Sequence, residues 1–141
     1  MKQLMQLCLV LITLSMGAQN NLKNGIAIQG YDPVAYFEDG KAIAGNKEIS
    51  ATFDNATYFF SKEAHKVLFL QDPSKFVPQY GGYCAYGLSK GYKAPINPNA
   101  FTIVNDKLYL NYSLEIKAEW LKQRDERILK ANENWEKIKN K

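Results

Sequence analysis

Short apolar runs separated by turn residues predict most of the strands in this chain. The runs lie at residues 49–53, 56–60, 101–104 and 108–110. Two polar residues, Asp54 and Asn55, join the first pair of runs, and residues 105–107 join the second pair. Such short polar connections between apolar runs are typical of β-hairpins. Residues 34–37, which follow a turn, predict one more short strand.

Apolar residues at helical spacing predict a short helix near the middle of the chain. Ala64, Val67 and Leu68 have this spacing, and Ser61 stands where an N-cap would be expected. The helix should end before Asp72, because the next residue is proline. Residues 79–91, which hold four glycines, are expected to form a loop or a tightly packed connection.

A long helix is predicted from Ser113 to about Lys139, since neither Gly nor Pro interrupts this segment. Its apolar residues recur every seven positions, at Leu114, Leu121, Ile128 and Trp135. Ser113 is expected to cap the helix. We expect the first half of this helix to pack on the sheet, and the part beyond about Arg127 to contribute less to stability. The fold class is therefore α+β, with a small antiparallel sheet, short helices and a long C-terminal helix.

The first residues have the pattern of a secretory signal peptide. Lys2 is followed by an uncharged, largely apolar run over residues 4–14 and by the small residues Gly17 and Ala18. The run is too short to span a bilayer, which takes about 20 apolar residues. We expect a signal peptide over 1–18, a polar arm over 19–29 and a single domain over 30–141. The domain would be exported, either periplasmic or secreted, and the alternative is an uncleaved N-terminal anchor.

The charge pattern argues against a nucleic-acid partner. The chain has 18 Lys and Arg residues against 14 Asp and Glu residues, but near its C-terminal end the two signs interleave. Mixed signs on one segment are typical of a solvated helix face rather than a surface that follows phosphates. No second apolar segment follows the leader, so we expect no membrane-spanning segment after processing.

After the leader the sequence has one cysteine, one histidine and no methionine. This count excludes an intramolecular disulfide, a CxxC redox pair and a Met-rich copper site in the processed domain. It also excludes a zinc site of four cysteines, or of two cysteines and two histidines. Any thiol or imidazole chemistry must therefore use Cys84 and His65.

Cys84 and His65 are thus the candidate site residues. Cys84 follows two glycines, and its thiolate would suit a soft metal ion such as Cu(I) or Zn(II). His65 lies on the predicted short helix and would supply a second ligand or a general base. The alternatives are a small buried thiol for Cys84 and an ordinary helix position for His65. A Cys–His nucleophilic pair is also conceivable.

Other polar and aromatic residues have weaker functional signals. Asp32 and Asp72 are expected to be turn or cap residues, because each precedes a proline. Four tyrosines surround Cys84 in the sequence, at positions 80, 83, 86 and 92. They could line a pocket, although roles in the core are the simpler expectation.

Three stretches in order resemble exported YHS-domain proteins. They are Gly30-Tyr31-Asp32-Pro33-Val34-Ala35-Tyr36-Phe37, Tyr58-Phe59-Phe60-Ser61 leading to Asp72-Pro73-Ser74-Lys75-Phe76, and Pro78-Gln79-Tyr80-Gly81-Gly82-Tyr83-Cys84-Ala85. The resemblance covers nearly all of the chain after the leader. That family is similar to small metal-binding modules in which two cysteines hold a heavy metal. Here Phe60 stands in place of the first cysteine and Ala64-His65 in place of the second, so the resemblance does not supply that ligand pair.

The sequence favours an exported, non-catalytic binding domain, with copper or another soft transition metal as its ligand. Cys84 would be the central metal ligand and His65 a second one. One alternative is a small thiol-dependent enzyme or redox protein that uses Cys84. Another is a structural or interaction module whose long C-terminal helix contacts a protein partner.

Overall fold

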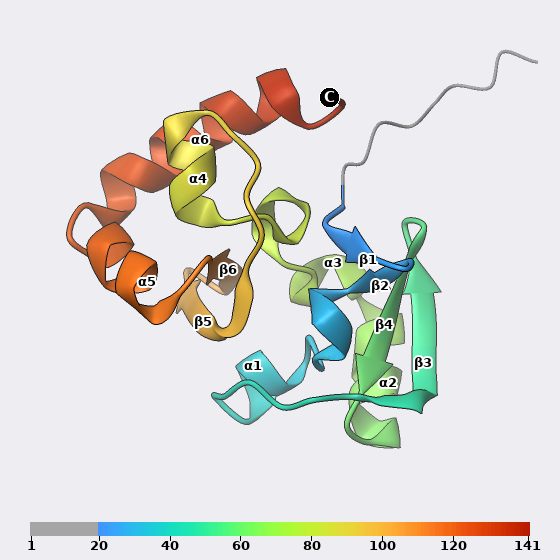
Figure 1. The fold of residues 1–141 in the computed structure, drawn as a ribbon. Helices are drawn as coiled ribbons and strands as arrows, with labels where there is room; N and C mark the ends of the chain where they lie inside the picture. The colour runs from blue at the N-terminus through green and yellow to red at the C-terminus, as the bar shows by residue number, and fades with distance from the viewer. Residues whose placement is uncertain (1–19) are drawn as a thin grey trace, which may run out of the picture.

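Two separate β-structures, each covered by helices, organise the chain in the computed structural model, which describes residues 20–141 (Figure 1). The fold class is α+β. The signal peptide predicted over 1–18 lies outside the described residues. Within 20–141, no helix is both long and apolar enough to cross a membrane.

The first β-structure is a four-stranded sheet with the strand order β1-β2-β4-β3. Its strands are β1 (Leu22–Lys23), β2 (Ile26–Ala27), β3 (Asn46–Phe53) and β4 (Ala56–Phe60). Strands β2 and β4 run parallel, so the sheet is mixed rather than purely antiparallel. The segment expected to be a polar arm thus contributes the two short strands β1 and β2 to the sheet, and Ala27 and Ile28 are buried in the core.

Both predicted hairpins are confirmed. Strands β3 and β4 pair across Asp54 and Asn55, whose φ angles are 50° and 63°. The second β-structure is an antiparallel pair, β5 (Asn97–Val104) and β6 (Lys107–Asn111), joined by Asn105 and Asp106 with φ angles of 50° and 59°. Positive φ at both central residues matches the twist of tight hairpins, and Asn and Asp tolerate it better than most residues do.

Residues 34–37, expected to be a strand, instead belong largely to a short helix, α1 (Ala35–Glu38). The cause is local, because the Asp32 carboxylate accepts hydrogen bonds from the N–H groups of Val34 and Ala35 at 2.8 and 3.2 Å. These bonds satisfy N–H groups of the first helical turn. Val34, Ala35 and Tyr36 are buried and Phe37 is partly buried, which explains the apolar run without a strand.

The predicted middle helix is present as α2 (Glu63–Gln71), followed by α3 (Pro73–Phe76). Phe69 of α2 packs on the first sheet, with ring centroids 5.0 Å from Tyr58 and 5.1 Å from Phe60. Ser61 is not the N-cap of α2: the cap is Lys62, and the Ser61 hydroxyl bonds to Asp32 instead.

Residues 79–91, expected to be a loop or to pack tightly against another element, contain two helical segments, and the second of them packs on α6 (Arg124–Ile138). These are the 3₁₀ turn η2 (Gln79–Gly82) and the helix α4 (Ala85–Lys90). Another 3₁₀ turn, η1 (Ile28–Gly30), follows β2. Gly91 ends α4 in a left-handed conformation, with φ of 93°, and its N–H bonds back to the helix. Of the four glycines in this stretch, Gly91 ends a helix, whereas Gly81 and Gly82 lie within η2 and Gly87 lies within α4.

The prediction of a single long C-terminal helix from Ser113 is wrong in one respect, because the helix is broken at Lys122 and Gln123. The two parts are α5 (Leu114–Leu121) and α6 (Arg124–Ile138). Ser113 caps α5 as expected, accepting a hydrogen bond from the Ile116 N–H. The break allows α6 to turn back and pack along α4 (Figure 1), which a straight helix of about 40 Å could not do on so small a body.

The predicted apolar stripe is also wrong for α5. Leu114 and Leu121 are 61% and 43% exposed, whereas Trp120 is fully buried against Tyr109. In α6, Ala131 is fully buried and Trp135 packs beside it. The part beyond Arg127 is therefore a component of the core rather than an extension beyond it.

Strand β6 lies between two clusters of buried apolar side chains. Leu108 and Leu110 belong to the first cluster, which also holds the side chains packed between the first sheet and α2. Tyr109 belongs to the second cluster, with Trp120 and Ala131. Because successive side chains of a strand point to opposite faces, β6 forms a wall of both clusters.

Candidate functional site

Cys84 lies between η2 and α4 and is almost completely buried, with 1% of its surface exposed. Its thiol donates a hydrogen bond to Oδ1 of Asn111 over 3.4 Å. Its backbone N–H donates to the carbonyl oxygen of Ala94 over 3.0 Å. The residue is thus held from two sides, by the end of β6 and by the segment after α4.

Asn111 is a site residue that the sequence analysis missed. It is fully buried at the end of β6, and its Oδ1 accepts hydrogen bonds from both the Cys84 thiol and the Tyr86 N–H. Its Nδ2 has no hydrogen-bond partner within the described part of the chain. The side chain therefore positions the beginning of α4, and nothing in the local sequence marks it as doing so.

A cavity of about 250 Å³ opens beside Cys84. Its walls are formed by Cys84, Tyr86, Gly87, Tyr92, Ala94, Tyr112 and Ile116. A Cβ at Gly87 would lie 3.1 Å from both the ring and the carbonyl oxygen of Tyr92, so a larger residue here would require Tyr92 to shift. Tyr92 and Tyr112 are about half exposed, and they place aromatic rings at the outer edge of the cavity.

The four tyrosines near Cys84 have two different roles. Tyr86 and Tyr92 line the cavity, as one of the two sequence expectations had it. Tyr80 and Tyr83 instead pack against Trp135 of α6, with ring centroids at 6.3 and 6.4 Å. Burial raises the pKa of both of these phenols above the usual value, so they stay neutral at physiological pH.

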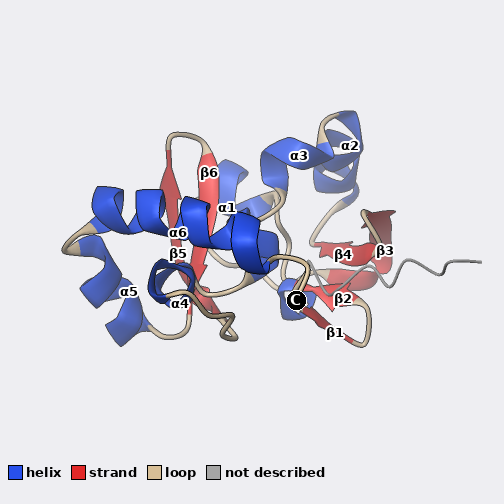
Figure 2. Ribbon diagram, turned by 90° about the horizontal axis from the view of Figure 1, so that it is seen from above, coloured by secondary structure: helices blue, strands red, loops and turns tan. Residues whose placement is uncertain are grey.

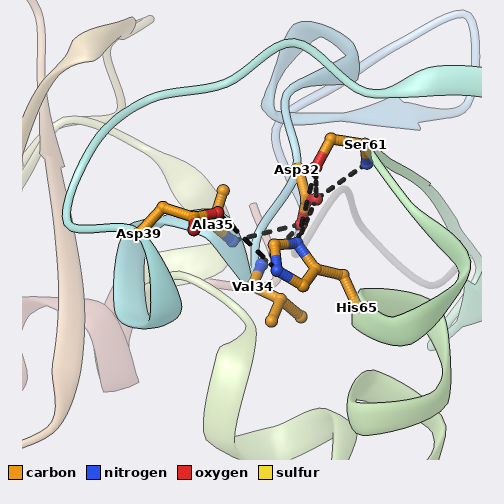
Figure 3. Close-up of polar contacts among 6 residues, drawn as sticks. All are labelled: Asp32, Val34, Ala35, Asp39, Ser61 and His65. Carbon is orange, nitrogen blue, oxygen red and sulfur yellow. Dashed lines mark hydrogen bonds and ion pairs between the residues drawn. The ribbon is translucent and has the colours of Figure 1, made fainter.

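His65 lies in a different polar cluster, around the buried carboxylate of Asp32 (Figure 3). Its Nδ1 is 2.7 Å from Oδ2 of Asp32. The same oxygen accepts hydrogen bonds from the N–H and the hydroxyl of Ser61, both at 2.7 Å. Asp32 is a turn residue, as expected, but its carboxylate also connects the turn to β4 and α2.

The geometry of this cluster fixes the orientation of the imidazole. An ionised carboxylate only accepts hydrogen bonds, so Nδ1 of His65 carries the proton. Nε2 is directed at Oδ2 of Asp39, 3.6 Å away. Ser61 has its hydroxyl on the carboxylate, whereas a Ser–His–Asp triad needs that hydroxyl on the free imidazole nitrogen. The cluster is therefore an anchor for the fold and not a hydrolytic triad.

The structure does not bring Cys84 and His65 together. Cys84 precedes α4, which packs on α6, whereas His65 is on α2, which packs on the first sheet; Figures 1 and 2 show these helices in different parts of the molecule. Each side chain also has its own partner, Asn111 or Asp32. Between residues 20 and 141, no group of three or more His, Cys, Asp and Glu side chains is arranged to hold a metal ion. Cys84 and His65, the two ligands expected for copper, are therefore not positioned to bind one metal ion together.

Comparisons with known proteins found no matching family model, no matching curated protein and no matching solved structure.

Proposed function

We propose that this chain is a non-catalytic binding domain whose ligand is a small, neutral and largely apolar molecule. The observation that carries the proposal is the cavity of about 250 Å³ beside Cys84, with three tyrosine rings in its walls. Ligand sites are commonly concave, apolar and lined by aromatic side chains, with a few polar groups that orient the ligand.

The size of the cavity limits the ligand. An apolar cavity of about 150 Å³ is large enough to hold benzene. One of about 250 Å³ has room for a substituted ring or a short branched chain, and it lies below the usual range of about 300–1,000 Å³ for drug-sized ligands. The ligand would be a metabolite-sized molecule rather than a peptide or a cofactor.

The walls favour a neutral ligand. None of the seven lining residues carries a formal charge at neutral pH, and most of the lining is aromatic or aliphatic. Aromatic rings pack well against other rings in edge-to-face or offset arrangements. The thiol of Cys84 is the polar group at the inner wall, and Asn111 holds it in place from behind.

A thiol enzyme is less well supported by this geometry. Nucleophilic catalysis by cysteine needs a base within hydrogen-bond reach of the sulfur. The thiol instead donates to an amide oxygen, and His65 donates to Asp32. Export of the domain and binding of a soft metal ion at Cys84 remain proposals that rest on the leader pattern and on the single thiol.

The test is a titration with two neutral ring compounds, indole and p-cresol, followed by backbone amide chemical shifts. We expect saturable shifts at Gly87 and Ile116 in the wild-type protein. Ala94→Phe fills the cavity from its wall and should abolish them. Ala118→Phe, on the exposed side of α5, is the matched control and should bind as the wild type does.

A second readout uses the thiol itself. Alkylation of the buried Cys84 by iodoacetamide requires local opening, and it should slow in the presence of a bound ring compound because the ligand stabilises the closed state. The proposal is overturned if neither compound produces saturable shifts, or if the folded Ala94→Phe protein binds them as well as the Ala118→Phe protein does.

A further inference from the structure

A second recess lies between α4 and α6, apart from the cavity beside Cys84. Its volume is about 350 Å³, and its walls are Ser89, Lys90, Gln123, Glu126, Arg127 and Lys130. The two helices that form it pack closely along their lengths. The groove is therefore formed mainly by residues of two packed helices, with Gln123 from the break before α6.

The groove carries an excess of positive charge. Three of its six lining residues are cationic, and only Glu126 is acidic. Clefts lined by one sign of charge concentrate the field and raise the local concentration of counter-ions. The groove therefore attracts anions more strongly than the mixed charges elsewhere on α6 do.

Arg127 is the half-buried cation among the residues that line the groove. Its guanidinium lies 4.6 Å from the centroid of the Tyr86 ring, and the side chain is half-buried. Its Nε atom is buried and has no hydrogen-bond partner among residues 20–141. Buried guanidinium donors are normally paired, so Arg127 keeps hydrogen-bonding capacity that the described residues around it do not use.

The neighbouring Arg124, unlike Arg127, has a hydrogen-bond partner for its Nε atom. It belongs to the same helix, and its Nε donates to Oδ1 of Asp125 over 2.9 Å. No carboxylate of the described residues forms an ion pair with Arg127. Arg127 is thus a half-buried cation that acts on Glu119 only from beyond ion-pair distance, whereas Arg124 forms an ordinary surface pair with Asp125.

Lys90 reinforces the arrangement from the opposite helix. Its Nζ lies 5.6 Å from the centroid of the same Tyr86 ring, so two cations converge on one aromatic side chain. Cation–π contacts hold both groups near the ring while leaving their donors available. Tyr86 is itself held in place, because its N–H bonds to Asn111.

We propose that this groove binds an oxyanion, the carboxylate or phosphate group of a small molecule, with Arg127 as its main partner. The fork of the guanidinium suits two oxygens of such a group, and Lys90 and Lys130 add point charges around it. The proposal does not rest on the neutral ligand proposed for the cavity beside Cys84, although Tyr86 contributes to both places.

Isothermal titration calorimetry of the full chain tests the proposal, with sodium phosphate and sodium acetate as probes and the ionic strength held constant with sodium chloride. We expect saturable one-to-one binding of at least one probe. Arg127→Gln should weaken it by about tenfold or more, since a charge-assisted bidentate contact is lost. Arg124→Gln is the matched control on α6 and should bind as the wild type does.

Two further variants keep the test decisive. If circular dichroism shows that Arg127→Gln does not fold, Lys130→Gln removes an exposed charge of the same groove and should weaken binding by a few-fold. Arg127→Lys should lie between the wild type and Arg127→Gln. Binding of phosphate but not acetate would identify phosphoryl groups as the ligand class. Binding of acetate but not phosphate would identify carboxylates, and binding of both would show that the groove recognises oxyanions in general. Absence of saturable binding, or equal losses in Arg124→Gln and the folded groove variants, would overturn the proposal.

Discussion

A single buried carboxylate, that of Asp32, joins three segments that are far apart in the sequence. It accepts hydrogen bonds from the N–H groups at the start of α1, from Ser61 after β4 and from His65 on α2. Hydrogen bonds to a charged group contribute more than neutral ones, and a buried charge left without them is costly. The cluster therefore stabilises the junction between the turn, β4 and α2.

We expect Asp32→Asn to destabilise the domain by about 3 kcal/mol, because the amide would direct N–H groups at donors that now bond to a carboxylate oxygen. Urea unfolding monitored by circular dichroism gives the value. Asp39→Asn is the control: Asp39 is partly exposed and 3.6 Å from His65, so its loss should cost less than about 1 kcal/mol. Equal effects of the two variants would show that Asp32 is not the centre of the cluster.

Tyr36 should make the free energy of unfolding depend on pH in the alkaline range. Burial, and to a lesser degree Tyr31 and Asp32, raise the pKa of its phenol above the usual value of 10.0. As the pH rises, the unfolded chain loses the Tyr36 proton before the folded chain does. The stabilisation by the buried neutral phenol is therefore present below about pH 10 and is lost as the pH rises beyond that value. The hydroxyl also donates to the Pro98 carbonyl over 2.7 Å.

Tyr36→Phe should therefore cost about 1 kcal/mol at pH 7, where it removes one hydrogen bond. Between pH 9 and pH 11.5 it should lose less stability than the wild type loses, because one buried titrating group has been removed. Thermal unfolding at both pH values measures the difference. A steeper alkaline loss in the variant would contradict the assignment.

Cys84 remains the residue on which the copper hypothesis depends. If the domain binds Cu(I) tightly, Cys84→Ser should abolish that binding, since no other thiol or thioether follows the leader. Because His65 is bound to Asp32 in another part of the structure, His65→Gln should leave the affinity unchanged. An anaerobic competition titration against a Cu(I) chelator measures both. Equal losses in the two folded variants would show that the side chains meet after all.

At the scale of elements, local chemistry determined what the sequence could predict. Both hairpins were predictable because Asp54-Asn55 and Asn105-Asp106 can adopt the required positive φ angles. The break at Lys122 and Gln123 was not predictable from the sequence, because it involves neither Gly nor Pro and allows α6 to pack on α4. A strand was predicted where α1 forms because short buried apolar runs fit either element.

The buried face of α5 gives a direct test at this scale. Trp120→Ala should cost about 3–5 kcal/mol, because it empties a fully buried position beside Tyr109. Leu121→Ala, at the neighbouring and largely exposed position, should cost less than about 1 kcal/mol. Chemical denaturation of both variants gives the comparison. A larger loss for Leu121→Ala would restore the seven-residue stripe as the buried face.

At the scale of the whole molecule, the candidate site could be predicted only in part. Counting residue types singled out Cys84 and His65, and the tyrosines near Cys84 were noted as possible walls of a pocket. The separation of the two candidates, and the contributions of Asn111, Ala94 and Ile116, depend on contacts between distant segments. No sequence spacing encodes such contacts, so the cavity and the groove became visible only in the folded chain.

The position of β6 between the two apolar clusters has a consequence for how the protein unfolds. Both tryptophans belong to the second cluster, so their fluorescence reports on that side alone. Leu108→Ala changes only the first cluster, yet it should lower the fluorescence midpoint of unfolding as much as the midpoint seen by circular dichroism. The hydrogen-bonded amides of β6 should exchange with solvent only through global opening, and those of the exposed part of β3 much earlier. A chain with two cores would then melt as one cooperative unit, because neither core can open without removing a wall of the other.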